Sequence, residues 1–106
     1  MNKLNNSQQE LNLLRKIKAK PRVSQRDLAS SLSFSLGKLN YCLMALKKKG
    51  LIKINNFSKQ KNKIKYVKYI LTEKGIAYRT KLTIEFMKLK MQEYNELKKE
   101  IENDKE

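Results

Sequence analysis

A run of small and polar side chains between positions 35 and 41 could form hydrogen bonds to the edges of base pairs. Asn40 can bond both N6 and N7 of adenine, and Lys38 can donate to O6 or N7 of guanine. Gly37 lacks a side chain and would let a helix approach a duplex closely. The base-reading candidates are Ser35, Gly37, Lys38, Asn40 and Tyr41. The alternative is that Gly37 merely packs and Asn40 is a solvated amide.

A second set of basic and polar side chains could hold phosphates, which position a protein on DNA without reading its sequence. Gln25 and Arg26 stand at an expected helix start, where free backbone N–H groups also favour an anion. Four later lysines alternate, so part of that set should point one way. The backbone candidates are Gln25, Arg26, Lys59, Lys61, Lys63 and Lys65. A solvated helix start and edge-strand protection by lysine are the alternatives.

The charge distribution favours a polyanion as partner. The chain has 25 Lys and Arg against 10 Asp and Glu, a net charge of +15. Residues 1–91 carry 22 basic and 4 acidic side chains, whereas residues 92–106 carry 3 and 6. Neutralised phosphates release condensed counterions, so the basic body should bind nucleic acid. The alternative is that lysine only solubilises the surface.

Residue types that support catalysis or metal binding are scarce. The chain has no histidine, and its single cysteine cannot build a structural zinc site. The three glycines, at 37, 50 and 75, form no phosphate-cradling loop. We therefore expect no enzymatic activity, no catalytic residue, no cofactor and no metal. Cys42 adjoins the apolar face of its helix, which favours a packed thiol over an oxidant sensor.

Length and hydropathy favour one cytoplasmic domain with one core. The 106 residues are 40% hydrophobic, but no apolar run approaches the roughly 20 residues that span a bilayer. The polar stretch from Met1 to Glu10 does not resemble a signal peptide. A lone cysteine agrees with a reducing compartment, and no membrane partner is expected.

Capping signals predict three short helices in the first half of the chain. Ser7 and Glu10 have capping-box spacing, which predicts a first helix starting near Ser7, and Pro21 follows its end. Ser24 and Asp27 have the same cap spacing for a second helix. Ser35 caps a third helix, whose apolar face is Leu36, Leu39, Leu43 and Leu46.

Gly50 ends the third helix, and the pattern then changes to that of strands. Residues 51–54 and 64–70 predict a hairpin with a polar, basic connector from Asn55 to Lys63. Thr72 then caps a long helical segment that runs toward Ile101. The predicted fold is mainly α with a small β-hairpin: a winged helix-turn-helix with a long C-terminal helix.

The long C-terminal segment carries an apolar stripe that approximates a coiled-coil seam, interrupted by Lys90. The dimerisation candidates are Leu82, Thr83, Phe86, Met87, Leu89, Tyr94, Leu97 and Ile101. We expect a DNA-binding domain over residues 1–72 and a homodimerisation arm over residues 73–106. The alternative is that the stripe packs back onto the first helix of the same chain.

Three motifs carry a resemblance to a known family: SQRDLA at 24–29, SLGKLNYCL at 35–43 and LTEKG at 71–75. Together they resemble the MarR-type regulators, and most of all the short subgroup associated with exopolysaccharide loci. The resemblance covers roughly residues 8–97 and implies transcriptional control with the third helix as reader.

Two departures from the family pattern limit what the resemblance implies. The wing lacks the Asp-x-Arg element of larger members, so lysine contacts to phosphate replace arginine insertion. The chain is also too short for the extra terminal helices that build a ligand pocket, which leaves a small-molecule effector doubtful.

The function expected from the sequence is that of a sequence-specific regulator of double-stranded DNA. Its third helix would enter the major groove, and its basic wing would lie on the flanking backbone. The alternative is a winged-helix adaptor that binds proteins and has only non-specific affinity for nucleic acid.

Overall fold

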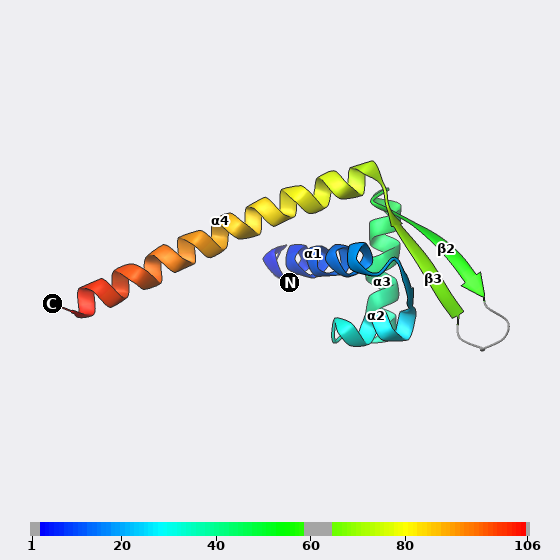
Figure 1. Ribbon diagram of the computed structural model, residues 1–106, viewed down its shortest axis with the longest axis horizontal. Helices are drawn as coiled ribbons and strands as arrows, with labels where there is room; N and C mark the ends of the chain where they lie inside the picture. Colours follow the sequence, from blue (N-terminus) through cyan, green and yellow to red (C-terminus); the bar gives the residue numbers. More distant parts are fainter. Residues whose placement is uncertain (1–2, 59–64, 106) are drawn as a thin grey trace.

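A computed structural model describes residues 3–58 and 65–105 of the chain (Figure 1). Its elements, in chain order, are α1 (Lys3–Ala19), β1 (Arg22–Ser24), α2 (Gln25–Ser31), α3 (Leu36–Lys48), β2 (Ile52–Ser58), β3 (Lys65–Leu71) and α4 (Glu73–Asp104). The molecule measures 68 × 26 × 25 Å, because α4 projects far beyond the body formed by the other elements. This arrangement confirms the predicted winged helix with a long C-terminal helix.

Helix α1 starts earlier than the sequence predicted. It begins at Lys3, so Ser7 lies inside the helix and the predicted start near Ser7 is wrong. The Glu10 carboxylate, which was expected to complete a capping box, bonds instead to side chains of other helices. The predicted end is confirmed, because α1 stops at Ala19, just before Pro21.

The helix-turn-helix follows the predicted caps. The Ser24 hydroxyl accepts a hydrogen bond from the Asp27 backbone N–H at 3.0 Å at the start of α2. The Ser35 hydroxyl accepts from the Lys38 N–H at 3.1 Å at the start of α3. Between the two helices Ser33 has a φ of 56°, which turns the chain sharply. Each cap satisfies a backbone donor that the first turn of a helix leaves free.

The inner face of α3 is the centre of the core. Leu39, Leu43 and Leu46 are at most 2% exposed and pack in one cluster with residues of α1, α2 and the sheet. Leu36, predicted for the same face, is 46% exposed, so that assignment is wrong. It is the first residue of the helix and lies beyond the edge of the cluster. Gly50 ends this region with a φ of +75°, as its sequence position predicted.

The wing belongs to a three-stranded antiparallel sheet with the order β1-β3-β2. The predicted two-stranded hairpin is therefore incomplete, because Arg22–Ser24 pairs with Tyr66–Lys68 of β3. Three residues are too few to show a strand period in sequence. Strand β2 is longer than predicted, since it reaches Ser58, whereas β3 has the predicted length and is shifted by one residue.

The start of α4 is locked against the body. The Thr72 hydroxyl accepts from the Gly75 N–H at 3.0 Å and donates to the Gly50 carbonyl at 2.6 Å. Gly75 is buried, and a Cβ at this position would overlap the carbonyl oxygen of Leu51. Leu82 is 3% exposed and Phe86 is half-buried, and beyond these residues α4 leaves the body. None of the helices in the described ranges is both long and apolar enough to cross a membrane.

Candidate nucleic-acid interface

The outer face of α3 presents the predicted base-reading residues to solvent. Gly37, Lys38, Asn40 and Tyr41 are all exposed, with Tyr41 at 78%. Nothing lies within 4 Å of the place a Cβ would occupy at Gly37. Ser35 is the N-cap of the helix, and its hydroxyl lies at the same tip. The structure thus brings all five candidates to one end of one exposed helix, where a major groove could reach them.

The ammonium group of Lys38 lies over the ring of Phe34, 4.5 Å from its centroid. A cation above an aromatic ring at an exposed site gains only about 0.5–1 kcal/mol. The contact therefore orients the lysine side chain at the tip of α3 while leaving it free to exchange the ring for an acceptor on a base.

The outer face of α3 extends beyond the five residues that the sequence singled out. Gly37, Tyr41, Met44 and Lys48 recur at helical spacing, so they form one stripe opposite the buried leucines. Met44 is 58% exposed. A shallow hollow on this face is lined by Asn40, Tyr41, Met44, Ala45, Lys47 and Lys48. Counting residues at i, i+4, i+7 and i+11 from Gly37 would have found Met44 and Lys48.

The two phosphate candidates of α2 differ in their surroundings. Arg26 is exposed, whereas Gln25 is half-buried. Burial raises the pKa of the Tyr69 hydroxyl, and the neighbouring Gln25 amide lowers it to a smaller extent. Gln25 is therefore turned in part toward the sheet, and Arg26 is the freer of the two to meet a phosphate.

The tip of the wing lies outside the described residues. Lys59, Lys61 and Lys63 belong to it, so their predicted role stays a prediction. Lys65 starts β3 and pairs with Ser58 through its backbone, but its side chain is also outside the described part.

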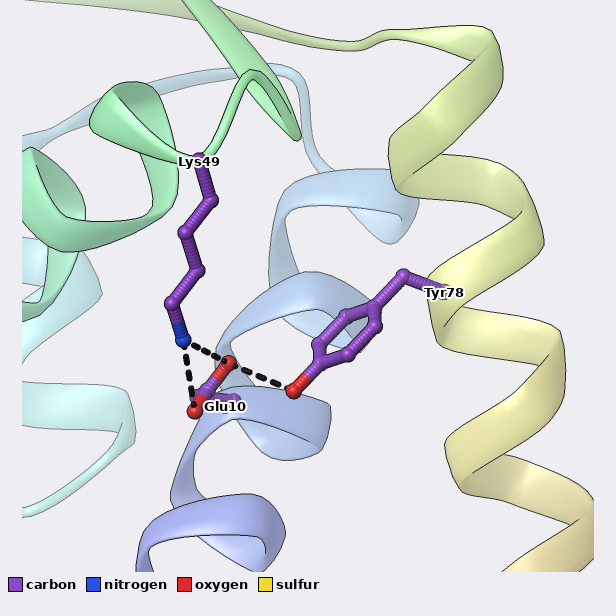
Figure 2. Close-up of polar contacts among 3 residues, drawn as sticks. All are labelled: Glu10, Lys49 and Tyr78. Atoms are coloured by element: carbon purple, nitrogen blue, oxygen red, sulfur yellow. Dashed lines mark hydrogen bonds and ion pairs between the residues drawn. The ribbon is translucent and has the colours of Figure 1, made fainter.

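A polar junction joins three helices at the opposite end of α3 (Figure 2). The Lys49 ammonium lies 3.4 Å from both carboxylate oxygens of Glu10, and the Tyr78 hydroxyl donates to Oε2 at 3.0 Å. Burial, followed by the Glu10 hydrogen bond and charge, raises the pKa of Tyr78 to about 12. The junction fixes the C-terminal end of α3 relative to α1 and α4.

Cys42 lies half-buried against the core, on the flank of α3. Burial raises the pKa of its thiol, and the nearby Lys38 charge opposes this to a smaller extent. A raised pKa lowers the thiolate fraction and hence the reactivity, which agrees with the predicted packed thiol. In the described part of the chain, His, Cys, Asp and Glu form no group that could hold a metal ion.

The predicted dimerisation residues divide into two groups along α4. Leu82 is buried within the single chain, Phe86 is half-buried, and the Thr83 hydroxyl bonds the Arg79 carbonyl at 2.7 Å. The outer members are all at least 42% exposed: Met87, Leu89, Tyr94, Leu97 and Ile101. Helix α4 contacts α1, and the first group is at least partly covered within the single chain, whereas the second group is exposed. Both the dimer seam and its alternative, packing onto α1, therefore stay predictions.

The fold is that of a winged helix-turn-helix in which the outer face of α3 is exposed. A family model described as winged helix-turn-helix DNA-binding matches residues 7–53, which span α1 to the start of β2. The matched class is a DNA-binding one and not an enzymatic one, in agreement with the sequence. No curated protein sequence is similar enough to the chain to count as a match.

The domain is structurally similar to MarR-type transcriptional regulators. MepR, a transcription regulator of the Staphylococcus aureus multidrug efflux pump MepA, superposes with a TM-score of 0.61 at 20% identity, over 83% of this chain and 63% of that one. The PcaV regulator of Streptomyces coelicolor gives 0.64 at 16%, over 77% and 58%. A mutant MarR from E. coli, complexed with operator DNA, gives 0.55 at 25%, over 69% and 50%. The chain spans less than two thirds of the length of each of these proteins.

Proposed function

We propose that the protein is a dimeric transcriptional regulator that binds a specific sequence of double-stranded DNA through α3. In this proposal the base-reading residues are Ser35, Gly37, Lys38, Asn40 and Tyr41. The residues that would contact phosphates, and so position the protein without reading its sequence, are Gln25, Arg26, Lys59, Lys61, Lys63 and Lys65. The E. coli MarR whose structure resembles this one was solved on operator DNA, which is the mode of binding proposed here.

The single observation that carries the proposal is the composition of the outer face of α3. The helix has its apolar side in the core, Lys38 and Asn40 exposed near its capped end, and no acidic residue along its length. A helix of this width fits the major groove of B-DNA, where its first turns meet base edges. An acid-free face also avoids repulsion from the phosphates on both sides of the groove.

The dimer is proposed from the outer part of α4. Its exposed apolar residues lie on a helix that leaves the body, so a second copy is the partner that would cover them. Two copies related by a two-fold axis would place two reading helices on a pseudo-palindromic site. Regulation of this kind takes place in the cytoplasm, and membership of the exopolysaccharide-associated subgroup rests on the sequence motifs alone.

The test begins with selection of preferred duplexes from a random pool by the full chain. Affinity for the selected site and for a scrambled duplex is then measured by fluorescence anisotropy. Lys38→Ala and Asn40→Ala should each lower the ratio of specific to non-specific affinity by about 5- to 150-fold, since a good base contact is worth about 1–3 kcal/mol.

Matched controls are Lys88→Ala and Asn95→Ala, which remove the same side chains from exposed positions of α4. These should keep the wild-type ratio. If the Lys38 and Asn40 variants also keep it, α3 is not the reader. If selection from the pool yields no preferred sequence, the adaptor with only non-specific affinity becomes the better description.

A further inference from the structure

Two large apolar side chains stand on the face of α3 that points away from the core. Tyr41 is 78% exposed and Met44 is 58% exposed, and the two are three residues apart, so they are neighbours on the helix surface. Gly37 precedes them by one turn and leaves open space. Hydrogen bonding to bases does not explain Met44, because its thioether has no donor and is only a weak acceptor.

The charge around the pair restricts what can cover it. Lys47 and Lys48 line the same hollow, and Lys38 stands one turn nearer the tip. Helix α3 carries no acid. The neighbouring Lys49 forms an ion pair with Glu10 within the chain. The partner that covers this pair should therefore carry negative charges where it faces the lysines and apolar groups where it faces Tyr41 and Met44.

The major groove of A·T-rich DNA has this combination. The C5-methyl group of thymine is the apolar group that base pairs present there, and phosphates border it on both sides. The helix rises about 4.5 Å over three residues, and successive base pairs are about 3.4 Å apart, so Tyr41 and Met44 can reach neighbouring base pairs. An unbranched, flexible methionine adapts well to such a contact.

We infer that Tyr41 and Met44 read thymine through its methyl group, and that Met44 is a specificity-determining residue of α3. This inference rests on the proposed DNA-binding function and deepens it. It assigns A·T pairs with thymine on the contacted strand to the middle of each half-site. Recognition of the methyl group also predicts a preference for DNA over RNA, because uracil lacks that group.

The experiment uses the duplex selected by the full chain and replaces each thymine in turn by deoxyuridine, which deletes only the methyl group. Wild-type affinity at fixed salt should fall about fourfold for each contacted methyl, since burying one such group is worth about 0.8 kcal/mol. Met44→Ala should bind the thymine and deoxyuridine duplexes equally at one of these positions. That loss of coupling identifies the contact, as in a double-mutant cycle.

Met91→Ala is the matched control, because Met91 is similarly exposed, at 60%, on α4. It should keep the full response to deoxyuridine. Circular dichroism should give equal helix content for both variants, because neither methionine is buried.

If a preferred sequence exists but no deoxyuridine substitution weakens wild-type binding, the methyl-reading inference is wrong and the proposed function stands. If Met44→Ala keeps the wild-type response at every position, the inference fails in the same way. Absence of any preferred sequence removes the proposed function as well.

Discussion

The outer face of α3 and the outer part of α4 both expose apolar side chains, but they differ in the charges beside them. Tyr41 and Met44 stand among lysines on a helix without acids. On α4, Leu97 and Ile101 stand among lysines and glutamates together, including Glu96 and Glu100. Apolar residues bordered only by basic side chains suit a polyanion as partner. Apolar residues bordered by both basic and acidic side chains suit a second copy of the same helix. An exposed apolar stripe is thus best interpreted together with the charges at its borders.

Salt should separate the two surfaces most strongly. Raising salt from about 50 to about 200 mM should weaken DNA binding about a thousandfold or more, if a dimer makes six or more phosphate contacts. Dimerisation should change little, because apolar burial does not release counterions. Fluorescence anisotropy measures DNA affinity, and sedimentation velocity on the same samples measures dimerisation. Equal salt dependence would mean that α4 does not act through its apolar residues.

An acidic substitution on the α4 stripe should weaken the dimer by a large factor. Leu97→Asp places an unpaired charge at a position meant for apolar burial, and we expect dimer affinity to fall about a hundredfold. Asn95→Asp adds the same charge on the other side of the helix and should leave the dimer intact. Sedimentation equilibrium measures both, and an undisturbed Leu97→Asp dimer would exclude this stripe as the seam.

The two glycines at the starts of α3 and α4 should respond oppositely to alanine. Gly75→Ala should lower the free energy of unfolding by about 1–3 kcal/mol, because the new methyl group meets the Leu51 carbonyl. Gly37→Ala meets open space and should not lower it, although it should weaken DNA binding by blocking close approach. Urea unfolding measures the stability of both variants, and fluorescence anisotropy measures their DNA affinity. A wild-type stability for Gly75→Ala would contradict the close approach of α4 to the Leu51 backbone.

The smallest effect concerns the polar junction at high pH. The pKa of Tyr78 is raised from 10.0 to about 12, so the folded chain keeps this proton where the unfolded chain has lost it. Its contribution to stability is complete below pH 10 and is lost as pH rises toward 12. Tyr78→Phe should therefore show a shallower fall in the free energy of unfolding over this range. Urea unfolding at a series of pH values measures this, and a slope equal to that of the wild type for Tyr78→Phe would contradict the contribution of the junction.

Local signals fixed much of this protein in advance. The caps at Ser24, Ser35 and Thr72 and the left-handed turn at Gly50 were predictable, because each depends on one residue and its near neighbours. The same holds for the period of the α3 leucines and for the exposure of Lys38 and Asn40 on the flanks of that helix. These features predicted the winged-helix class and the position of α3 within it.

Only the tertiary structure decided what depends on distant segments. Glu10 has the spacing of a local cap, but it bonds residues 39 and 68 positions away in sequence. Arg22–Ser24 is a strand only because β3 lies beside it, and Leu82 is covered only because α4 passes the body before projecting. A sequence pattern reports the preference of a segment for a conformation, whereas a contact between segments depends on how the whole chain packs.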